Sequence, residues 1–284
     1  MDVSFTLLAS GYGTAEAPTL DGEGGFYFSD PIDGGVYHRD GAGEVQVVVP
    51  KRRGVGGICL HADGGLVISG RDVTHQNGGE ARILFGRDHY AAAGLDPATS
   101  FNDICADERG RVLAGAVWGG VFDENSKGAL VLVDEHGRGR VLYDGVVGSN
   151  GLALDRARRR LYQCSSFNRR IIVSEPDGDA YRKVGEIPTD AAPGFPDGLK
   201  LDDQGRLWIA CHRADSVVCL DVDGRLLDRI KTPASDVTSL CFAGTDRPEM
   251  IVVTANHAER PDLRGCIFRT SVDVRGAPVE KVRI

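Results

Sequence analysis

An apolar, strand-like segment begins anew six times along this chain, each time after a short turn. The restarts lie about 40 to 48 residues apart, the spacing expected for four-stranded propeller blades. They fall near Pro18, Ile58, Ile104, Leu152, Leu199 and Leu240. The repeat predicts an all-β chain folded as a six-bladed β-propeller, in a single domain over residues 1–284.

The fifth repeat shows the pattern in its clearest form. Its apolar segments at 199–201, 206–210, 216–220 and 226–230 are separated by short turns that contain Asp or Gly. This pattern is typical of antiparallel strands joined as hairpins. Glycine makes up 38 of the 284 residues, about twice the ~7% average, which suits a chain with many tight turns.

The N-terminal segment and one internal segment do not follow the repeat. Residues Val3 to Leu8 predict a strand that belongs to none of the six repeats. We expect it to complete the last blade, because pairing of N- and C-terminal segments closes the ring and removes free strand edges. The segment from Arg71 to Asp88 has no clear alternation and predicts a loop over one face, whereas His89 to Leu95 predicts one or two helical turns.

Charge and cysteine content exclude several classes of function. The formal net charge of -8 argues against nucleic acid or an anionic membrane as a partner, because both call for a basic surface. The sequence contains neither a signal-peptide pattern nor an apolar run long enough to span a membrane. The seven cysteines include no Cys-x-x-Cys pair, so we expect buried, reduced thiols in a cytoplasmic protein. The expected partner is a small-molecule substrate, and the sequence does not indicate the oligomeric state.

Four of the six restarts have a carboxylate or an amide residue two positions earlier. These residues are Glu16, Asn102, Asn150 and Asp197. Equivalent positions of different blades converge on a propeller axis, so two carboxylates and two amides would form an oxygen-lined site for a divalent cation. Asn102 would either bind the ion or hold the substrate. Asn-Gly and Asp-Gly are also common turn dipeptides, but a turn does not require this shared register.

The segments around these residues carry a family resemblance. They read Glu16-Ala17-Pro18, Phe101-Asn102-Asp103, Ser149-Asn150-Gly151-Leu152-Ala153 and Phe195-Pro196-Asp197-Gly198-Leu199. They resemble the signature stretches of the superfamily that comprises regucalcin, gluconolactonase and luciferin-regenerating enzyme, the SMP-30-like lactonases. The resemblance spans the chain and implies a six-bladed propeller that hydrolyses a lactone with the help of a divalent metal ion.

The same resemblance implies roles for individual residues. One ion would be held by Glu16, Asn150 and Asp197, with Asn102 beside it to position the substrate. The ion would polarise the ring carbonyl and activate a water whose proton Asp197 accepts, which makes Asp197 the catalytic residue. Oxygen ligands suit Ca2+, Mg2+, Mn2+ and, less selectively, Zn2+ or Fe2+, so the identity of the ion stays open.

The surroundings of Asn102 depart from the members that act on sugar lactones. Those members tend to place an Arg two residues before this Asn, where the chain has Ser100, and an acidic residue at the position of Gly120. The neighbourhood offers Trp118 and Phe122 instead. We therefore expect a lactone less polar than an aldonolactone, with Asn102 and Trp118 among the substrate-binding residues.

His212 is a third candidate for substrate binding. It follows Cys211 at the end of a predicted strand, where the chain turns toward the pocket. A Cys-His nucleophilic pair is disfavoured, because adjacent residues on a strand point to opposite faces. His212 is then either a hydrogen-bond donor that lines the pocket or a structural histidine.

Two other functions stay open. The chain is alternatively a metal-dependent hydrolase or dehydratase of another carbonyl or ester substrate, or a propeller that binds a small molecule without catalysis. Architecture cannot decide between them, because propellers host many unrelated functions. A binding module would keep its activity in an Asp197→Ala variant, whereas a lactonase would not.

Overall fold

Six four-stranded antiparallel sheets make up the fold, as the sequence repeat predicts for a six-bladed β-propeller. The computed structural model describes residues 3–120, 123–244, 246–255 and 261–284. It divides into two compact units of three sheets each, formed by residues 1–55 and 188–278 and by residues 56–187 and 279–284. The prediction of one domain over residues 1–284 stays a prediction.

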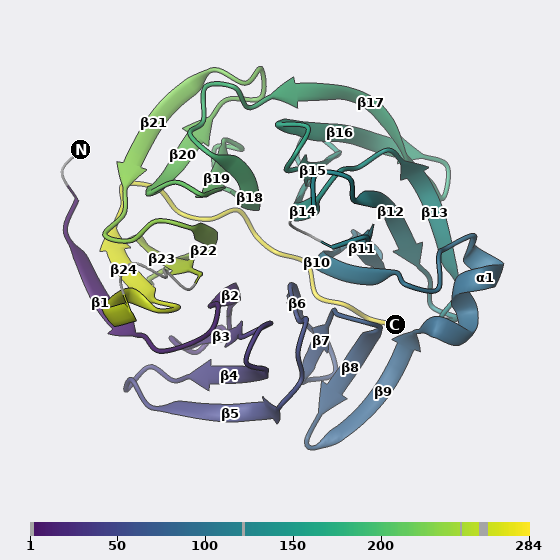
Figure 1. Ribbon diagram of the computed structural model, residues 1–284, viewed down its shortest axis with the longest axis horizontal. Helices are drawn as coiled ribbons and strands as arrows, with labels where there is room; N and C mark the ends of the chain where they lie inside the picture. The colour runs from purple at the N-terminus through teal and green to yellow at the C-terminus, as the bar shows by residue number, and fades with distance from the viewer. Residues whose placement is uncertain (1–2, 121–122, 245, 256–260) are drawn as a thin grey trace. The chain divides into compact units, whose positions relative to one another are not determined.

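The first unit contains three sheets, whose strands are labelled in Figure 1. One sheet has β2 (Glu16–Leu20), β3 (Phe26–Ser29), β4 (Gly35–Arg39) and β5 (Val45–Pro50). The next has β18 (Phe195–Leu201), β19 (Leu207–His212), β20 (Ser216–Leu220) and β21 (Leu226–Lys231). The third has β22 (Val237–Ala243), β23 (Glu249–Thr254), β24 (Ile267–Ser271) and β1 (Phe5–Ala9).

The second unit also contains three sheets, each of four consecutive strands. One has β6 (Ile58–Leu60), β7 (Leu66–Ile68), β8 (Val73–Asn77) and β9 (Glu80–Phe85). The next has β10 (Ser100–Ala106), β11 (Val112–Trp118), β12 (Lys127–Val133) and β13 (Gly139–Asp144). The third has β14 (Ser149–Asp155), β15 (Arg160–Ser165), β16 (Arg170–Asp177) and β17 (Ala180–Pro188).

The expected exchange between the two ends of the chain is confirmed. Strand β1 pairs with β24 in antiparallel register, with Phe5 opposite Thr270, so the N-terminal strand completes the last sheet (Figure 1). The expected helical turns at 89–95 are confirmed by η1 (Arg87–His89) and α1 (Tyr90–Ala93). Within the described residues, the one other helical segment is η2 (Pro261–Leu263).

The prediction of a loop from Arg71 to Asp88 is wrong. This segment forms strands β8 and β9, which pair with each other. The alternation is missing because burial changes along each strand instead of from one residue to the next. Strand β8 begins buried and ends exposed, and β9 begins exposed and ends buried.

An Asp side chain closes many of the turns between strands. In the turn before β19, the backbone N–H groups of Gln204 and Arg206 donate to Asp202 Oδ1, and Arg206 Nε and Trp208 Nε1 donate to Asp202 Oδ2. The same arrangement of an Asp with an Arg four residues later recurs at Asp107, Asp134 and Asp221. These carboxylates fix the hairpins by holding the backbone of each turn.

The apolar core lies between neighbouring sheets of the same unit. In the second unit one cluster joins the sheets of β6–β9 and β10–β13 through residues such as Val67, Phe101 and Val131. In the first unit a cluster around Trp208 and Phe242 joins the sheets of β18–β21 and β22–β24. All seven cysteines are buried free thiols, as expected.

Candidate active site

The four residues of the common register, Glu16, Asn102, Asn150 and Asp197, lie on the first strand of their sheets, in or directly before an interruption of the strand pairing. Phe101 pairs with Ala116 and Ile104 pairs with Ala114, so β10 has one residue more than β11 between these two pairs. The extra residue is accommodated at Asn102 and Asp103. Such a bulge redirects side chains that a regular strand would point alternately to opposite faces, and bulges are common beside active sites.

The same interruption recurs on other first strands. On β14 the interruption lies between Ser149 and Leu152 and includes Asn150. On β18 it lies between Pro196 and Leu199 and includes Asp197. On β2 it falls between Glu16 and Thr19, so Glu16 is the last paired residue before the interruption and not part of it. The register inferred for Glu16 from the sequence is therefore displaced by one residue relative to the other three.

Asn102 and Asn150 lie together in the second unit. Asn102 Nδ2 donates to the backbone oxygen of Ser149 and to Asn150 Oδ1, both at 3.0 Å. A backbone carbonyl only accepts, so the group of Asn102 that faces it must be the NH2. Its second hydrogen then requires an acceptor on Asn150, which orients the Asn150 amide with Oδ1 toward Asn102.

Two further contacts support this amide pair. Asn150 Nδ2 faces Ser166 Oγ at 3.4 Å, consistent with the same orientation. Gln163, which is fully buried, donates from Nε2 to Ser149 Oγ at 2.8 Å and so fixes the residue whose carbonyl orients Asn102. The orientation of both amides therefore follows from a hydrogen-bond chain that starts at the backbone.

The two predicted carboxylate ligands lie in the first unit, and both are buried. Glu16 is 7% exposed and Asp197 is 2% exposed. Glu16 Oε2 accepts the N–H of Ala17 at 2.8 Å, and Ala17 has a φ of 52°, a left-handed conformation that is rare for alanine. A non-glycine residue in this conformation is sustained only by its surroundings and is typical of functional sites.

Thr238 supports the backbone beside Glu16. Its Oγ1 is 2.7 Å from the backbone oxygen of Ala15 and 3.2 Å from that of Val253. Thr238 also lies at an interruption of strand pairing, between Val237 and Ser239 on β22. It is the residue two positions before the sixth restart, so the same register could have identified it, but the prediction was limited to carboxylates and amides and did not include it.

His212 lies beside Asp197. His212 Nδ1 and Asp197 Oδ2 are 3.8 Å apart, and Phe195 is paired with His212 across β18 and β19. Burial lowers the pKa of His212, an effect that outweighs the attraction of Asp236. The neighbouring Cys211 is fully buried, and its thiol faces the backbone oxygen of Ile209 at 3.8 Å.

Trp118 occupies the end of β11, where it is half-buried and packs against the core cluster of the second unit. Its role in substrate binding stays a prediction. Phe122 lies outside the described residues. Among the described residues, no group of three or more His, Cys, Asp or Glu side chains is clustered to hold a metal; the predicted ligand set combines two carboxylates with an amide.

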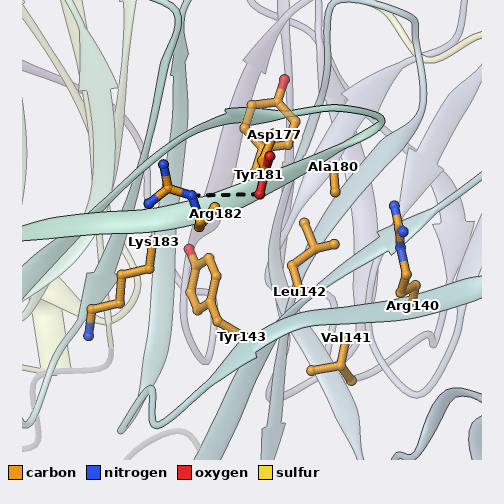
Figure 2. A pocket seen from close by; sticks show the side chains of 9 residues that line it. All are labelled: Arg140, Val141, Leu142, Tyr143, Asp177, Ala180, Tyr181, Arg182 and Lys183. Atoms are coloured by element: carbon orange, nitrogen blue, oxygen red, sulfur yellow. Dashed lines mark ion pairs between the residues drawn. The ribbon is translucent and has the colours of Figure 1, made fainter.

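A groove of about 370 Å3 lies elsewhere, along β13 and β17 (Figure 2). Its cationic side chains already have acceptors. Arg182 pairs with Asp177 at 3.6 Å, Lys183 pairs with Glu186 at 2.5 Å, and Arg140 donates to the backbone oxygen of Asp179 at 3.3 Å. Two of these three cationic side chains are therefore paired with carboxylates of the protein, and the third is hydrogen-bonded to the backbone.

Comparison with known proteins bears on the family. The model of the SMP-30/Gluconolactonase/LRE-like region matches residues 14–256. This chain belongs to that family. Pentonolactonase XacC of Haloferax volcanii is 29% identical over 237 residues, which cover 79% of this chain and 78% of the relative. Regucalcin of Xenopus laevis is 27% identical over 241 residues, which cover 78% of each chain.

Solved structures agree on the fold. A luciferin-regenerating enzyme has a TM-score of 0.86 at 20% identity over 99% of this chain and 100% of its own. Regucalcin of Agrobacterium tumefaciens, described as a calcium-binding protein, has a TM-score of 0.82 at 17% identity over 99% of this chain and 98% of its own. The family and the six-bladed propeller predicted from the sequence are both confirmed.

Proposed function

We propose that this protein is a lactonase, a hydrolase that opens a cyclic ester with water, and that it depends on a divalent metal ion. The observation that carries the proposal is the recurrence of one strand interruption at Asn102, Asn150 and Asp197, with Glu16 directly before a fourth. The relative that is named a pentonolactonase supports the same reaction class.

The proposed ligands are Glu16, Asn150 and Asp197, whose donor atoms fit a hard divalent cation. All three offer oxygen, and two of them are carboxylates in buried positions, where a negative charge needs compensation. Asn150 Oδ1 accepts one hydrogen bond from Asn102 and retains a second lone pair for a ligand. The bound ion would polarise the ester carbonyl and acidify a water.

The side chains of the protein would perform the remaining steps. A carboxylate oxygen of Asp197 would accept the proton of the attacking water and later pass a proton to the leaving ring oxygen. Asn102 would hold Asn150 in its orientation and contact the substrate. His212, kept neutral by burial beside Asp197, would hydrogen-bond to the substrate, and Trp118 would contact its less polar part.

The substrate class follows from the same neighbourhood. Ser100 and Gly120 favour a lactone with fewer hydroxyl groups than an aldonolactone, whereas the relative from Haloferax volcanii is named a pentonolactonase. A screen must therefore include both kinds. We also propose a cytoplasmic location, supported by seven buried free thiols. Among the described residues, no helix is long and apolar enough to cross a membrane.

The test is a hydrolysis screen of the purified protein over sugar, aliphatic and aromatic lactones, with each candidate metal added in turn after chelation. We expect acid release that requires a divalent ion and that is lost in Asp197→Ala and in Asn150→Ala. Gly185→Ala is a suitable control, because a Cβ at Gly185 has no heavy atom within 4 Å. Hydrolysis that persists in Asp197→Ala, or no hydrolysis of any lactone by the wild type, would overturn the proposal.

A further inference from the structure

In the second repeat, the residue two positions before the strand restart has no side-chain oxygen that could act as a ligand. Two residues before the restart at Ile58 the chain has Gly56, where the third, fourth and fifth repeats have Asn102, Asn150 and Asp197. Gly56 is buried, and its φ lies outside the left-handed range, so the backbone conformation does not itself require glycine. The reason for glycine must therefore be space.

The missing side chain of Gly56 leaves room for Asn102. A Cβ built on Gly56 would lie 1.8 Å from Asn102 Oδ1 and 2.9 Å from its Cγ. Both distances are far inside van der Waals contact, so even the smallest side chain at position 56 would displace the Asn102 amide. The displaced group is the one that hydrogen-bonds to Asn150.

Neither side of this contact is free to give way. Asn102 Nδ2 uses both of its hydrogens, on Ser149 and on Asn150. The backbone of Gly56 and Gly57 is held in turn, because both N–H groups donate to Ser69 Oγ, at 3.2 and 2.8 Å, and Ser69 is fully buried. A substitution at Gly56 must therefore break hydrogen bonds of Asn102 or shift a backbone that Ser69 fixes.

We infer that Gly56 is a positioning residue of the active site, which acts by leaving the space that Asn102 occupies. This inference rests on the proposed function for its effect on catalysis, but the contact itself does not depend on that function. Gly57 has a different role. A Cβ there would meet the backbone nitrogen of Ile104 at 2.6 Å, so its replacement would strain the strand itself.

The test is a double-mutant cycle that combines Gly56→Ala with Asn102→Ala, with Gly185→Ala as the matched glycine control. In lactone hydrolysis we expect Gly56→Ala to lower kcat/KM about tenfold or more when Asn102 is present. In the Asn102→Ala background the same change should cost less than about threefold, because the displaced amide is gone. Equal losses in the two backgrounds, or no loss in either, would overturn the inference.

Thermal unfolding separates this inference from the proposed function. If the wild type hydrolyses no lactone, Gly56→Ala should still lower the Tm more with Asn102 present than in the Asn102→Ala background, whereas equal shifts would contradict the contact. A Gly56→Ala protein that fails to fold is also informative. Recovery of a folded protein on adding Asn102→Ala would support the inference, and failure of both variants to fold would contradict it.

Discussion

The amide residues of the second unit and the carboxylate residues of the first are held in different ways. Asn102 and Asn150 are oriented by a chain of side-chain hydrogen bonds that begins at the backbone oxygen of Ser149. Beside Glu16 the backbone itself is unusual, because Ala17 is left-handed and its N–H donates to Glu16 Oε2, and beside Asp197 lies the imidazole of His212. In the proposed site the amides would contribute orientation and the carboxylates charge, so we expect substitutions in the two regions to change different measured quantities.

The largest effect should come from removing charge in the first unit without changing shape. Asp197→Asn keeps the size of the side chain but removes the proton acceptor and one negative charge. We expect kcat of lactone hydrolysis to fall roughly 10²–10⁴-fold, the usual contribution of a general base, with unchanged far-ultraviolet circular dichroism. A loss below tenfold in steady-state assays would show that the charge of Asp197 is not needed.

A smaller effect should follow when one hydrogen-bond donor of the second unit, the side-chain NH2 of Asn102, is replaced by an acceptor. Asn102→Asp places a carboxylate oxygen against the backbone oxygen of Ser149 and against Asn150 Oδ1, where the NH2 now donates. Because two acceptors would then face each other, kcat/KM should fall further in Asn102→Asp than in Asn102→Ala, by about tenfold. Equal activity of the two variants would mean that the amide orientation has no influence on catalysis.

The support beneath Glu16 should matter mainly for stability. Thr238→Val removes the hydroxyl that donates to Ala15 while keeping the shape of the side chain. The backbone oxygen would lose a buried partner, at a cost of about 1–3 kcal/mol in the free energy of unfolding. Urea denaturation measures this cost. Thr238→Ser, which retains the hydroxyl, should lose less, and the reverse order would exclude the hydrogen bond as the cause.

The smallest effect should come from Ser166. Its contact with Asn150 Nδ2 is 3.4 Å long, near the limit of a hydrogen bond, whereas Asn102 contacts the other end of the same amide at 3.0 Å. Ser166→Ala should therefore change kcat/KM by less than about threefold. A loss as large as that of Asn102→Ala would show that the orientation of Asn150 depends on Ser166 to the same degree.

Much of the architecture was predictable because strands and turns are local. The pattern predicted all four strands of the fifth repeat to within a few residues. The common register indicated Asn102, Asn150 and Asp197, which lie at equivalent strand interruptions. The roles of these residues stay predictions. Strands β8 and β9 were missed because their burial does not alternate from one residue to the next.

The parts that could not be predicted depend on space and on contacts between neighbouring sheets. The sequence contains Gly56 at the register position, but only the structure relates its missing Cβ to Asn102. The role of Thr238 likewise depends on the backbone of Ala15, which is 223 residues away along the chain. The one-residue displacement of Glu16 arises from the pairing of β2 with β3, which no single segment specifies.

The most direct test of the central claim is the number of divalent ions bound per chain as lactone hydrolysis is restored. Chelator-treated wild type and Asp197→Asn would be titrated in parallel by calorimetry, and hydrolysis would be measured in the same samples. We predict that the wild type binds one ion per chain and regains activity in proportion, and that Asp197→Asn binds the ion more weakly and regains at most about a hundredth of that activity. Lactone hydrolysis that survives chelation in full, or activity restored without stoichiometric binding, would contradict the claim.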